Sequence, residues 1–418
     1  MVHNHPPRRY RLTLTKFAAV LAFAVLAAAL AQAQTFKLLH SFSNGGDGGS
    51  PTAGITFDAA GNIYGTASTG GDNNAGTVFE MKRNGDGWTL NTLHTFEPNQ
   101  GDGSTPLGGV SFGPGGAMFG TTANGGTGCL GGCGAVYSVR APQTFCHTGV
   151  CPWVEGVAWG FHGYPSDGIQ PWYENLVFDS LGNIYGTTCG GGPVNYGIVF
   201  ELTPSGNGWA EEILHRFTGA DGSCPQSGVV FDSAGNLYGT TASGGTDNEG
   251  VLYELSPSGS GRWTQTILHN FTLQQNEEAP VGSVTPDIYG NFYGMTVSGE
   301  VYELTPSGNS WDFTAIYHLA KAGGYGALAI DAAGNLYGQQ FEGGQYGVGA
   351  VFKLSPNNGN WTYTDLHDFT IVNGGAFPDG WVTLDAQGNL YGTTSQGGMH
   401  SQGCGFWGCG SVWEITFQ

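Results

Sequence analysis

The chain has 418 residues, of which 75 are glycine and only 11% are charged, and its formal net charge is −20. Such an acidic chain repels nucleic-acid phosphates and anionic lipid surfaces, so we expect neither as a partner. Abundant glycine beside few charged residues is typical of short strands joined by tight turns rather than of helices.

The first 33 residues are typical of a secretory signal peptide. Four basic residues, the last of them Lys16, precede an apolar run of 14 residues from Phe17 to Leu30, and Ala31-Gln32-Ala33 fits a cleavage site. The alternative is an uncleaved membrane anchor, but the run is shorter than the ~20 residues that span a bilayer. We expect residues 34–418, with 8 basic and 32 acidic residues, to be secreted without a membrane span.

One sequence unit recurs along the rest of the chain, and its first copy is Asp58-Ala-Ala-Gly-Asn-Ile-Tyr-Gly65. Further copies begin at Gly113, Asp179, Asp232, Asp287, Asp331 and Asp385, those at Gly113 and Asp287 being the weaker ones. A repeat of about 50 residues that is rich in glycine and aromatic residues is typical of a β-propeller blade.

The copy in residues 228–271 shows the elements of one blade. Short strands are predicted at 228–231, 237–241, 251–255 and 266–271, and Asp232-Ser-Ala-Gly-Asn236 is a turn between the first two. Four antiparallel strands joined by short turns make one blade, which we denote a to d in chain order. The tryptophans that recur at the end of the c–d turn are expected to pack between blades; they are Trp88, Trp209, Trp263, Trp311 and Trp361.

The order of the strands predicts how the ring closes. Strand d, which reads Leu-His-x-Phe, has seven copies, and the first of them, 39–42, precedes every strand a. The chain ends on a strand c, at 410–418, so residues 35–42 should supply the missing fourth strand of the last blade. This arrangement removes open sheet edges. We therefore expect an all-β, closed seven-bladed β-propeller formed as a monomer by residues 34–418, rather than a linear solenoid.

With these motifs the chain resembles the GloVer (Gloeo/Verruco-type) tandem repeat family of secreted bacterial proteins. The motifs are D-x-x-G-N-x-Y-G-T-T at 179–188, G-x-V-F-E-L at 197–202 and L-H-x-F at 214–217, and the resemblance covers essentially residues 35–418. It implies a bacterial protein in the periplasm or outside the cell, and it supplies no catalytic residues. Family members often carry a C-terminal anchoring segment; this chain stops at Gln418, so we expect no surface anchor.

Eight cysteines favour disulfides in a secreted chain. The close pairs in sequence are Cys129 with Cys133, Cys146 with Cys151, and Cys404 with Cys409, which leaves Cys189 and Cys224. The alternative is zinc, because some of these spacings occur in zinc sites, but an oxidising compartment disfavours zinc thiolates. The pair Cys146 and Cys151 lies in 140–153, an expanded c–d turn of the second blade that should lie opposite the d–a connections.

Histidine and aspartate recur at matching places in the repeat. Strand d carries His40, His94, His162, His215, His269, His318 and His367. A ring of histidines on the outermost strands is too wide for one metal, so we expect each to form a hydrogen bond with a neighbouring turn. Asp-Gly occurs in four d–a connections, at Asp47, Asp102, Asp167 and Asp221. These carboxylates near the channel mouth are candidate calcium ligands, the alternative being that Asp-Gly only makes the turn.

Five aromatic residues outside the repeat pattern are expected on the same face, and they are Trp172, Tyr173, Trp381, Phe406 and Trp407. Aromatic rings beside carboxylates suit sugar binding, whereas the alternative is that they anchor glycine-rich loops. The sequence thus favours a non-catalytic binding protein for polysaccharide or an extracellular protein, with calcium as a candidate cofactor. The alternatives are a polysaccharide lyase or glycosidase at the channel mouth, and a purely structural protein-interaction ring.

Overall fold

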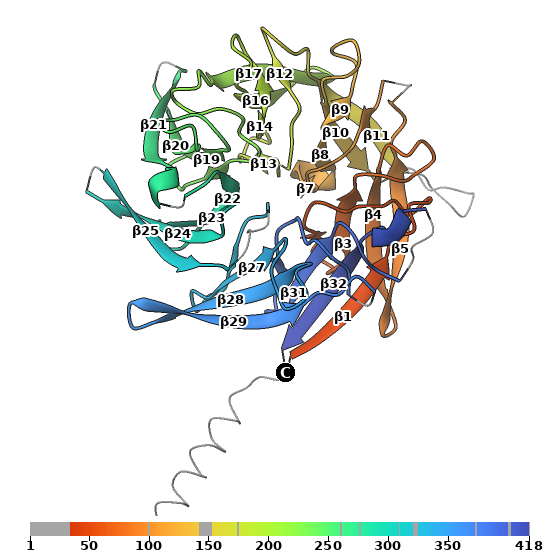
Figure 1. Cartoon of the computed structure of the whole chain (residues 1–418). Helices are drawn as coiled ribbons and strands as arrows, with labels where there is room; N and C mark the ends of the chain where they lie inside the picture. Colours follow the sequence, from red (N-terminus) through yellow and green to blue (C-terminus); the bar gives the residue numbers. More distant parts are fainter. Residues whose placement is uncertain are drawn as a thin grey trace, which may run out of the picture.

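A computed structural model describes residues 34–98, 101–141, 153–173, 175–259, 261–275, 277–308, 310–320, 325–372, 374–399 and 403–417. These residues form seven four-stranded antiparallel sheets arranged in a ring (Figure 1). The predicted seven-bladed β-propeller is confirmed. None of the helical segments in the described ranges has the length and apolar character that crossing a membrane requires.

The strands of blades 1 to 4 follow the order a to d from the channel outward. Blade 1 has β2 (Thr56–Phe57), β3 (Ile63–Ala67), β4 (Thr77–Asn84) and β5 (Gly87–Thr95). Blade 2 has β7 (Ser111–Phe112), β8 (Met118–Thr122), β10 (Ala135–Arg140) and β11 (Val154–Gly160). Blade 3 has β13 (Val177–Phe178), β14 (Ile184–Thr188), β16 (Ile198–Ser205) and β17 (Gly208–Arg216). Blade 4 has β18 (Val230–Phe231), β19 (Leu237–Thr241), β20 (Val251–Pro257) and β21 (Trp263–Asn270).

Blades 5 to 7 follow the same plan, with the N-terminal strand in the last of them. Blade 5 has β22 (Pro280–Pro286), β23 (Phe292–Thr296), β24 (Glu300–Ser307) and β25 (Ser310–His318). Blade 6 has β26 (Ala329–Ile330), β27 (Leu336–Gln340), β28 (Ala350–Asn357) and β29 (Asn360–Asp368). Blade 7 has β30 (Thr383–Leu384), β31 (Leu390–Thr394), β32 (Ser411–Phe417) and β1 (Gln34–Ser41). Three short 3-10 turns are η2 (Pro114–Gly116), η3 (Leu273–Gln275) and η4 (Gly405–Trp407).

The repeated Asp-x-x-Gly-Asn unit makes the turn between strands a and b. In blade 4, Asp232 accepts hydrogen bonds from the backbone N–H groups of Ala234 and Asn236, at 2.8 and 2.9 Å. Its other oxygen accepts from the Asn236 amide and the Tyr238 hydroxyl, at 2.8 and 3.2 Å. One aspartate therefore fixes both the turn and the first residues of strand b, which explains why the unit recurs.

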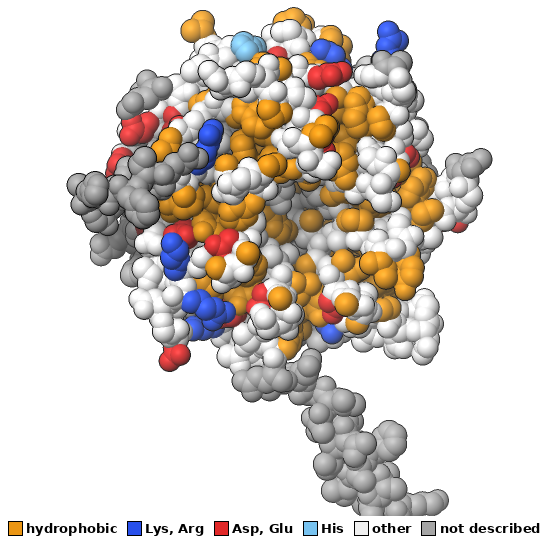
Figure 2. Space-filling model, turned by 180° about the vertical axis from the view of Figure 1, so that it is seen from behind, with side chains coloured by type: hydrophobic (Ala, Val, Ile, Leu, Met, Phe, Trp, Pro, Cys, Tyr) orange, Lys and Arg blue, Asp and Glu red, His pale blue; other side chains and the backbone are white. Residues whose placement is uncertain are grey.

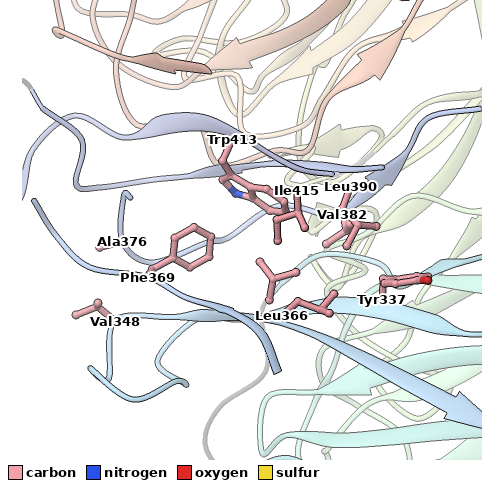
Figure 3. Close-up of a cluster of buried hydrophobic side chains, with 10 residues drawn as sticks. Tyr337, Val348, Leu366, Phe369, Ala376, Val382, Leu390, Trp413 and Ile415 are labelled. Atoms are coloured by element: carbon pink, nitrogen blue, oxygen red, sulfur yellow. The ribbon is translucent and has the colours of Figure 1, made fainter. Parts of the chain in front are cut away.

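The core lies between neighbouring blades. Between blades 6 and 7, Trp413, Leu390 and Ile415 pack with Leu366 and Tyr337, all of them buried (Figure 3). The recurring tryptophans pack from one blade onto the next, as predicted. Ring centroids lie 5.6 Å apart for Trp209 and Phe119, 6.5 Å for Trp263 and Tyr185, 6.1 Å for Trp311 and Tyr238, and 6.0 Å for Trp361 and Tyr293.

The two ends of the chain close the ring. β1 pairs antiparallel with β32, from Gln34 opposite Phe417 to Ser41 opposite Ser411. Blade 7 is then tied to blade 1 by the Thr393 hydroxyl, which donates to the Ala53 carbonyl at 2.6 Å. The predicted closure by the N-terminal strand is confirmed.

The two faces of the disc carry different connections. On the upper face the d–a connections pair with the b–c loops, as in β6 (Gly103–Ser104) with β9 (Asn124–Gly125) and β12 (Gly168–Ile169) with β15 (Gly190–Gly191). The lower face carries the a–b and c–d turns. Figure 2 shows this lower face, on which hydrophobic side chains gather around a hollowed centre.

Candidate functional site

One tryptophan occupies the channel where the other blades have smaller residues. The equivalent positions, which precede strand a in every blade but the fifth, where the position lies within β22, are Gly54, Gly109, Asn175, Gly228, Ser283, Ala327 and Trp381. The Trp381 indole lies so close to blades 1 and 2 that a Cβ at Gly54 or Gly109 would come within 2.4 or 2.5 Å of it. Its side chain is therefore directed across the hub, and these two glycines leave room for it.

Two tyrosines meet Trp381 at the hub. Tyr173 and Tyr325 come from the connections that lead into blades 3 and 6, and their rings stack 5.6 Å apart with planes at 12°. Together the three aromatic side chains line a cavity of about 250 Å³ with residues of the innermost strands. Because rings from well-separated blades converge here, the hub is an aromatic cluster.

A buried carboxylate, Asp379, belongs to this cluster. Its side chain is only 7% exposed, and its Oδ1 has no hydrogen-bond partner within the described part of the chain. Burial raises the pKa of Asp379 to about 7. Burial, and after it the charge of Asp379, also raises the pKa of Tyr173 and Tyr325, so both phenols stay protonated and can donate hydrogen bonds.

From the hub, a row of rings runs to the outer loops of blade 7, and we call it the aromatic row. It consists of Tyr173, Tyr325, Phe341, Phe377, Trp407 and Phe406. After the Tyr173–Tyr325 stack, successive centroids lie 6.3, 5.1, 5.7 and 5.5 Å apart. The outer end is the open one, because Trp407 is 44% and Phe406 82% exposed.

A polar groove of about 220 Å³ lies beside Trp407, lined also by Asn44, Asn74, Thr69 and Gln396. The Thr69 hydroxyl donates to Asn44 Oδ1 at 2.8 Å, which fixes the orientation of this amide. Amides and hydroxyls can both donate and accept hydrogen bonds. The groove therefore combines a partly exposed indole with neutral hydrogen-bonding groups.

A disulfide positions the loop that carries Trp407. Cys404 and Cys409 are bonded to each other and flank η4 on both sides. The disulfides Cys129–Cys133 and Cys189–Cys224 are present too, so these predictions are confirmed. Cys146 and Cys151 lie outside the described residues.

The five aromatic residues singled out in the sequence have different positions. Tyr173, Phe406 and Trp407 belong to the aromatic row, but Trp381 is directed into the channel, and Trp172 is half-buried next to Tyr173. Sequence reasoning missed Tyr325, Phe341 and Phe377, which join the two ends of the row. Aligning the blades would have pointed to Tyr325, because it stands where blade 3 has Tyr173.

The histidines of strand d form hydrogen bonds, as expected, except for His367. Five pair with a carboxylate of the following connection, at 2.8–3.1 Å; the pairs are His40–Asp47, His94–Asp102, His162–Asp167, His215–Asp221 and His269–Glu277. His318 pairs with Glu300 of strand c at 2.9 Å. His367 instead stacks on Phe36 at 3.7 Å, and its Nε2 has no partner in the described ranges.

These pairs place the four candidate calcium ligands beside the outermost strands. Asp47, Asp102, Asp167 and Asp221 each bond to the histidine of the strand d that precedes them, so they lie at the rim of the upper face and not at the channel mouth. The structure does not gather the four into one site. Calcium binding at any of them stays a prediction.

The lower face has a larger but more apolar groove, of about 790 Å³ between blades 5 and 6. Two side chains of one a–b turn stand out from it, Ile288 at 91% and Tyr289 at 81% exposure.

The fold and the site together define the class of protein, which is a disulfide-containing seven-bladed β-propeller with an aromatic row on its upper face. Residues 157–300 match the Gloeobacter/Verrucomicrobia repeat, which confirms that the chain carries the repeat of the GloVer family. No curated protein matches the sequence.

Solved structures with a similar fold have little sequence identity. A protein named as the extracellular domain of the putative hybrid two component system BT3049 from B. thetaiotaomicron is 12% identical with a TM-score of 0.52, over 91% of this chain and 41% of that one. A Thermus thermophilus protein named as a putative glucose dehydrogenase is 14% identical with a TM-score of 0.44, over 92% and 100%. A Bacteroides uniformis protein named as a putative 6-phosphogluconolactonase is 13% identical with a TM-score of 0.49, over 76% and 84%. The chain thus spans less than half of the first of these, and that likeness shows the fold alone.

Proposed function

We propose that this propeller is a secreted bacterial protein that binds polysaccharide through the aromatic row and the groove beside Trp407. The observation that carries the proposal is the row itself, six rings in contact from Tyr173 to Phe406, with an exposed outer end. Ligand sites combine aromatic surface with a few well-placed polar groups. Asn44, Asn74 and Gln396 supply neutral groups of the kind that sugar hydroxyls bond to.

Secretion is supported by the sequence of residues 1–33 and by the three disulfides, because disulfides persist in oxidising compartments. The partner would then be an extracellular or cell-envelope polysaccharide. The acidic chain favours neutral or basic glycans over strongly anionic ones.

The test is affinity electrophoresis of residues 34–418 in gels containing different polysaccharides. Trp407→Ala should abolish the retardation that the wild-type protein shows, because the partly exposed indole is removed. Tyr289→Ala, which removes an exposed ring from the lower face, is the matched control and should bind normally. Equal retardation of all three proteins, or none of the wild type on any glycan, would refute the proposal.

Asp379 supports a second candidate, a glycan-cleaving enzyme at the hub. A carboxyl group whose pKa is about 7 suits general acid–base catalysis at neutral pH, and the phenols of Tyr173 and Tyr325 are close enough to be influenced by its charge. Product analysis of each polysaccharide mixture distinguishes the candidates. Shortened chains that disappear with Asp379→Asn would establish the enzyme, whereas intact chains support the binding protein.

A further inference from the structure

The rim of the upper face holds three potential metal ligands where blade 1 meets blade 2. His94 lies near the end of strand d of blade 1, Asp102 lies in the connection that follows, and Glu155 comes from strand d of blade 2. His94 Nε2 and Asp102 Oδ2 are 2.8 Å apart. One ligand atom from each of the three residues lies within 4.8 Å of the others, and no other group of three or more such residues occurs in the described ranges.

The same junction elsewhere in the ring shows that the fold does not require a glutamate here. The strand register makes Glu155, Glu211, Gln265 and Phe313 equivalent, since they lie opposite Val139, Leu202, Leu255 and Leu304 of strand c. Between blades 3 and 4, Gln265 donates a hydrogen bond to the backbone carbonyl of Asp221 at 2.8 Å. Between blades 4 and 5, Phe313 stacks on His269 at 3.9 Å. A neutral or apolar side chain therefore serves the packing at these junctions.

Glu155 brings a second carboxylate close to that of Asp102, which already has hydrogen-bond partners. Asp102 accepts hydrogen bonds from the backbone N–H groups of Glu97 and Gly103, at 3.0 and 2.7 Å, and it pairs with His94. Glu155 Oε1 is buried and has no hydrogen-bond partner in the described part of the chain. Two ionised carboxylates this close repel each other, and a cation between them would relieve the repulsion. A cavity of about 470 Å³, which all three residues line, leaves room for one.

We propose that His94, Asp102 and Glu155 bind one divalent transition-metal ion. Zinc is the ion used to test this proposal. Imidazole nitrogen and carboxylate oxygen are both zinc ligands, at about 2.0–2.2 Å, so small side-chain rotations would bring the three atoms to one ion. Calcium prefers six to eight oxygen ligands, and this site offers a nitrogen and two carboxylates. Three protein ligands leave a fourth position for water or a bound group.

The next junction provides a matched control. Glu211 stands at the position of Glu155, but there His162 bonds Asp167 through Nδ1 and its side chain is 58% exposed. Among the described residues of that junction, no group of three ligand atoms forms. Replacing Glu211 should therefore leave metal binding unchanged, although it alters the same position of the neighbouring blade.

The experiment is calorimetric titration of metal-free, untagged residues 34–418 with zinc chloride and, separately, with calcium chloride. This segment contains the closed ring, since β1 and β32 pair without residues 1–33. We expect one zinc per chain, at least ~100-fold weaker binding in Glu155→Gln and in His94→Gln, and unchanged binding in Glu211→Gln. Circular dichroism of each variant checks that it is folded.

Three results would overturn the proposal. The first is that the wild type takes up no zinc. The second is that Glu155→Gln and His94→Gln, both folded, bind zinc as tightly as the wild type. The third is that calcium binds more tightly than zinc. The last result would show an oxygen-selective site and so a different set of ligands.

Discussion

At the scale of single residues, the role of each carboxylate depends on the hydrogen-bond donors and charges next to it. The aspartates of the d–a connections satisfy polar groups at the end of strand d by accepting from histidine and from backbone N–H groups, as Asp102 does from His94 and Gly103. Glu211 is different, because it lies against the carboxylate of Asp167. Burial and then the charge and hydrogen bonding of Asp167 raise the pKa of Glu211 to about 9, although Arg216 opposes this.

This pKa predicts how the stability depends on pH. The folded protein holds a proton on Glu211 that the unfolded chain, with an ordinary carboxyl pKa near 4.5, releases, so stability falls as pH rises between about 4.5 and 9. Glu211→Gln removes this dependence. At pH 8 the variant should exceed the wild type in free energy of unfolding by about 1–3 kcal/mol, and at pH 4 the two should agree.

Urea unfolding at the two pH values measures this difference. Glu212→Gln is the control, because Glu212 is the exposed neighbour on the same strand. A Glu211→Gln variant that is less stable than the wild type at pH 8 would show that the carboxylate is charged and stabilised in the folded protein.

At the scale of elements, the side chains that line the channel come from the innermost strands and from the residues just before them. Trp381 projects from the lead into β30 across to the glycines before β2 and β7. Removing a large ring from such a place leaves a cavity and costs stability. We expect Trp381→Ala to lower the free energy of unfolding by about 2–4 kcal/mol, whereas Trp407→Ala, at an exposed position, should change it by less than about 1 kcal/mol.

Denaturant unfolding of the two variants makes the comparison. If Trp381→Ala is as stable as the wild type, the indole does not fill the channel, and a role in ligand binding becomes the better explanation for it. Loss of stability in Trp407→Ala would mean that this ring supports the fold.

The repeated elements were also the part that sequence predicted best. Asp232 and Asn236 specify a turn by local hydrogen bonds, so the a–b hairpins could be read from spacing alone. The contents of the channel and the aromatic row could not be predicted from spacing, because Trp381 contacts Gly54, and Tyr173 contacts Tyr325, across the ring. Such contacts depend on the direction of side chains between distant blades. The placement of the aspartates at the channel mouth was wrong for a different reason, because each bonds locally to the histidine of the outermost strand that precedes it.

At the scale of the whole molecule, stability depends on a closed ring of similar blades. β1 supplies the outer strand of blade 7, and Phe42 just after it is fully buried against blade 1. Deleting residues 34–42 would expose the edge of β32 and remove this packing. We expect the shortened chain to lose most of its stability and to aggregate, while deletion of residues 1–33 has no such effect.

Size-exclusion chromatography and limited proteolysis measure the outcome. A synthetic peptide of residues 34–42 should restore the compact, protease-resistant form by adding the missing strand. A shortened chain that stays monomeric and resistant without the peptide would show that closure contributes little to the fold.

The central claim, that glycan binds on the upper face along the aromatic row, is tested most directly by hydroxyl-radical footprinting with and without a bound polysaccharide. We predict that the glycan protects Phe406 and Trp407 first, then Phe377 and Phe341, and that it leaves Ile288 and Tyr289 of the lower face as reactive as before. Protection of the lower-face residues with an unprotected aromatic row would contradict the account.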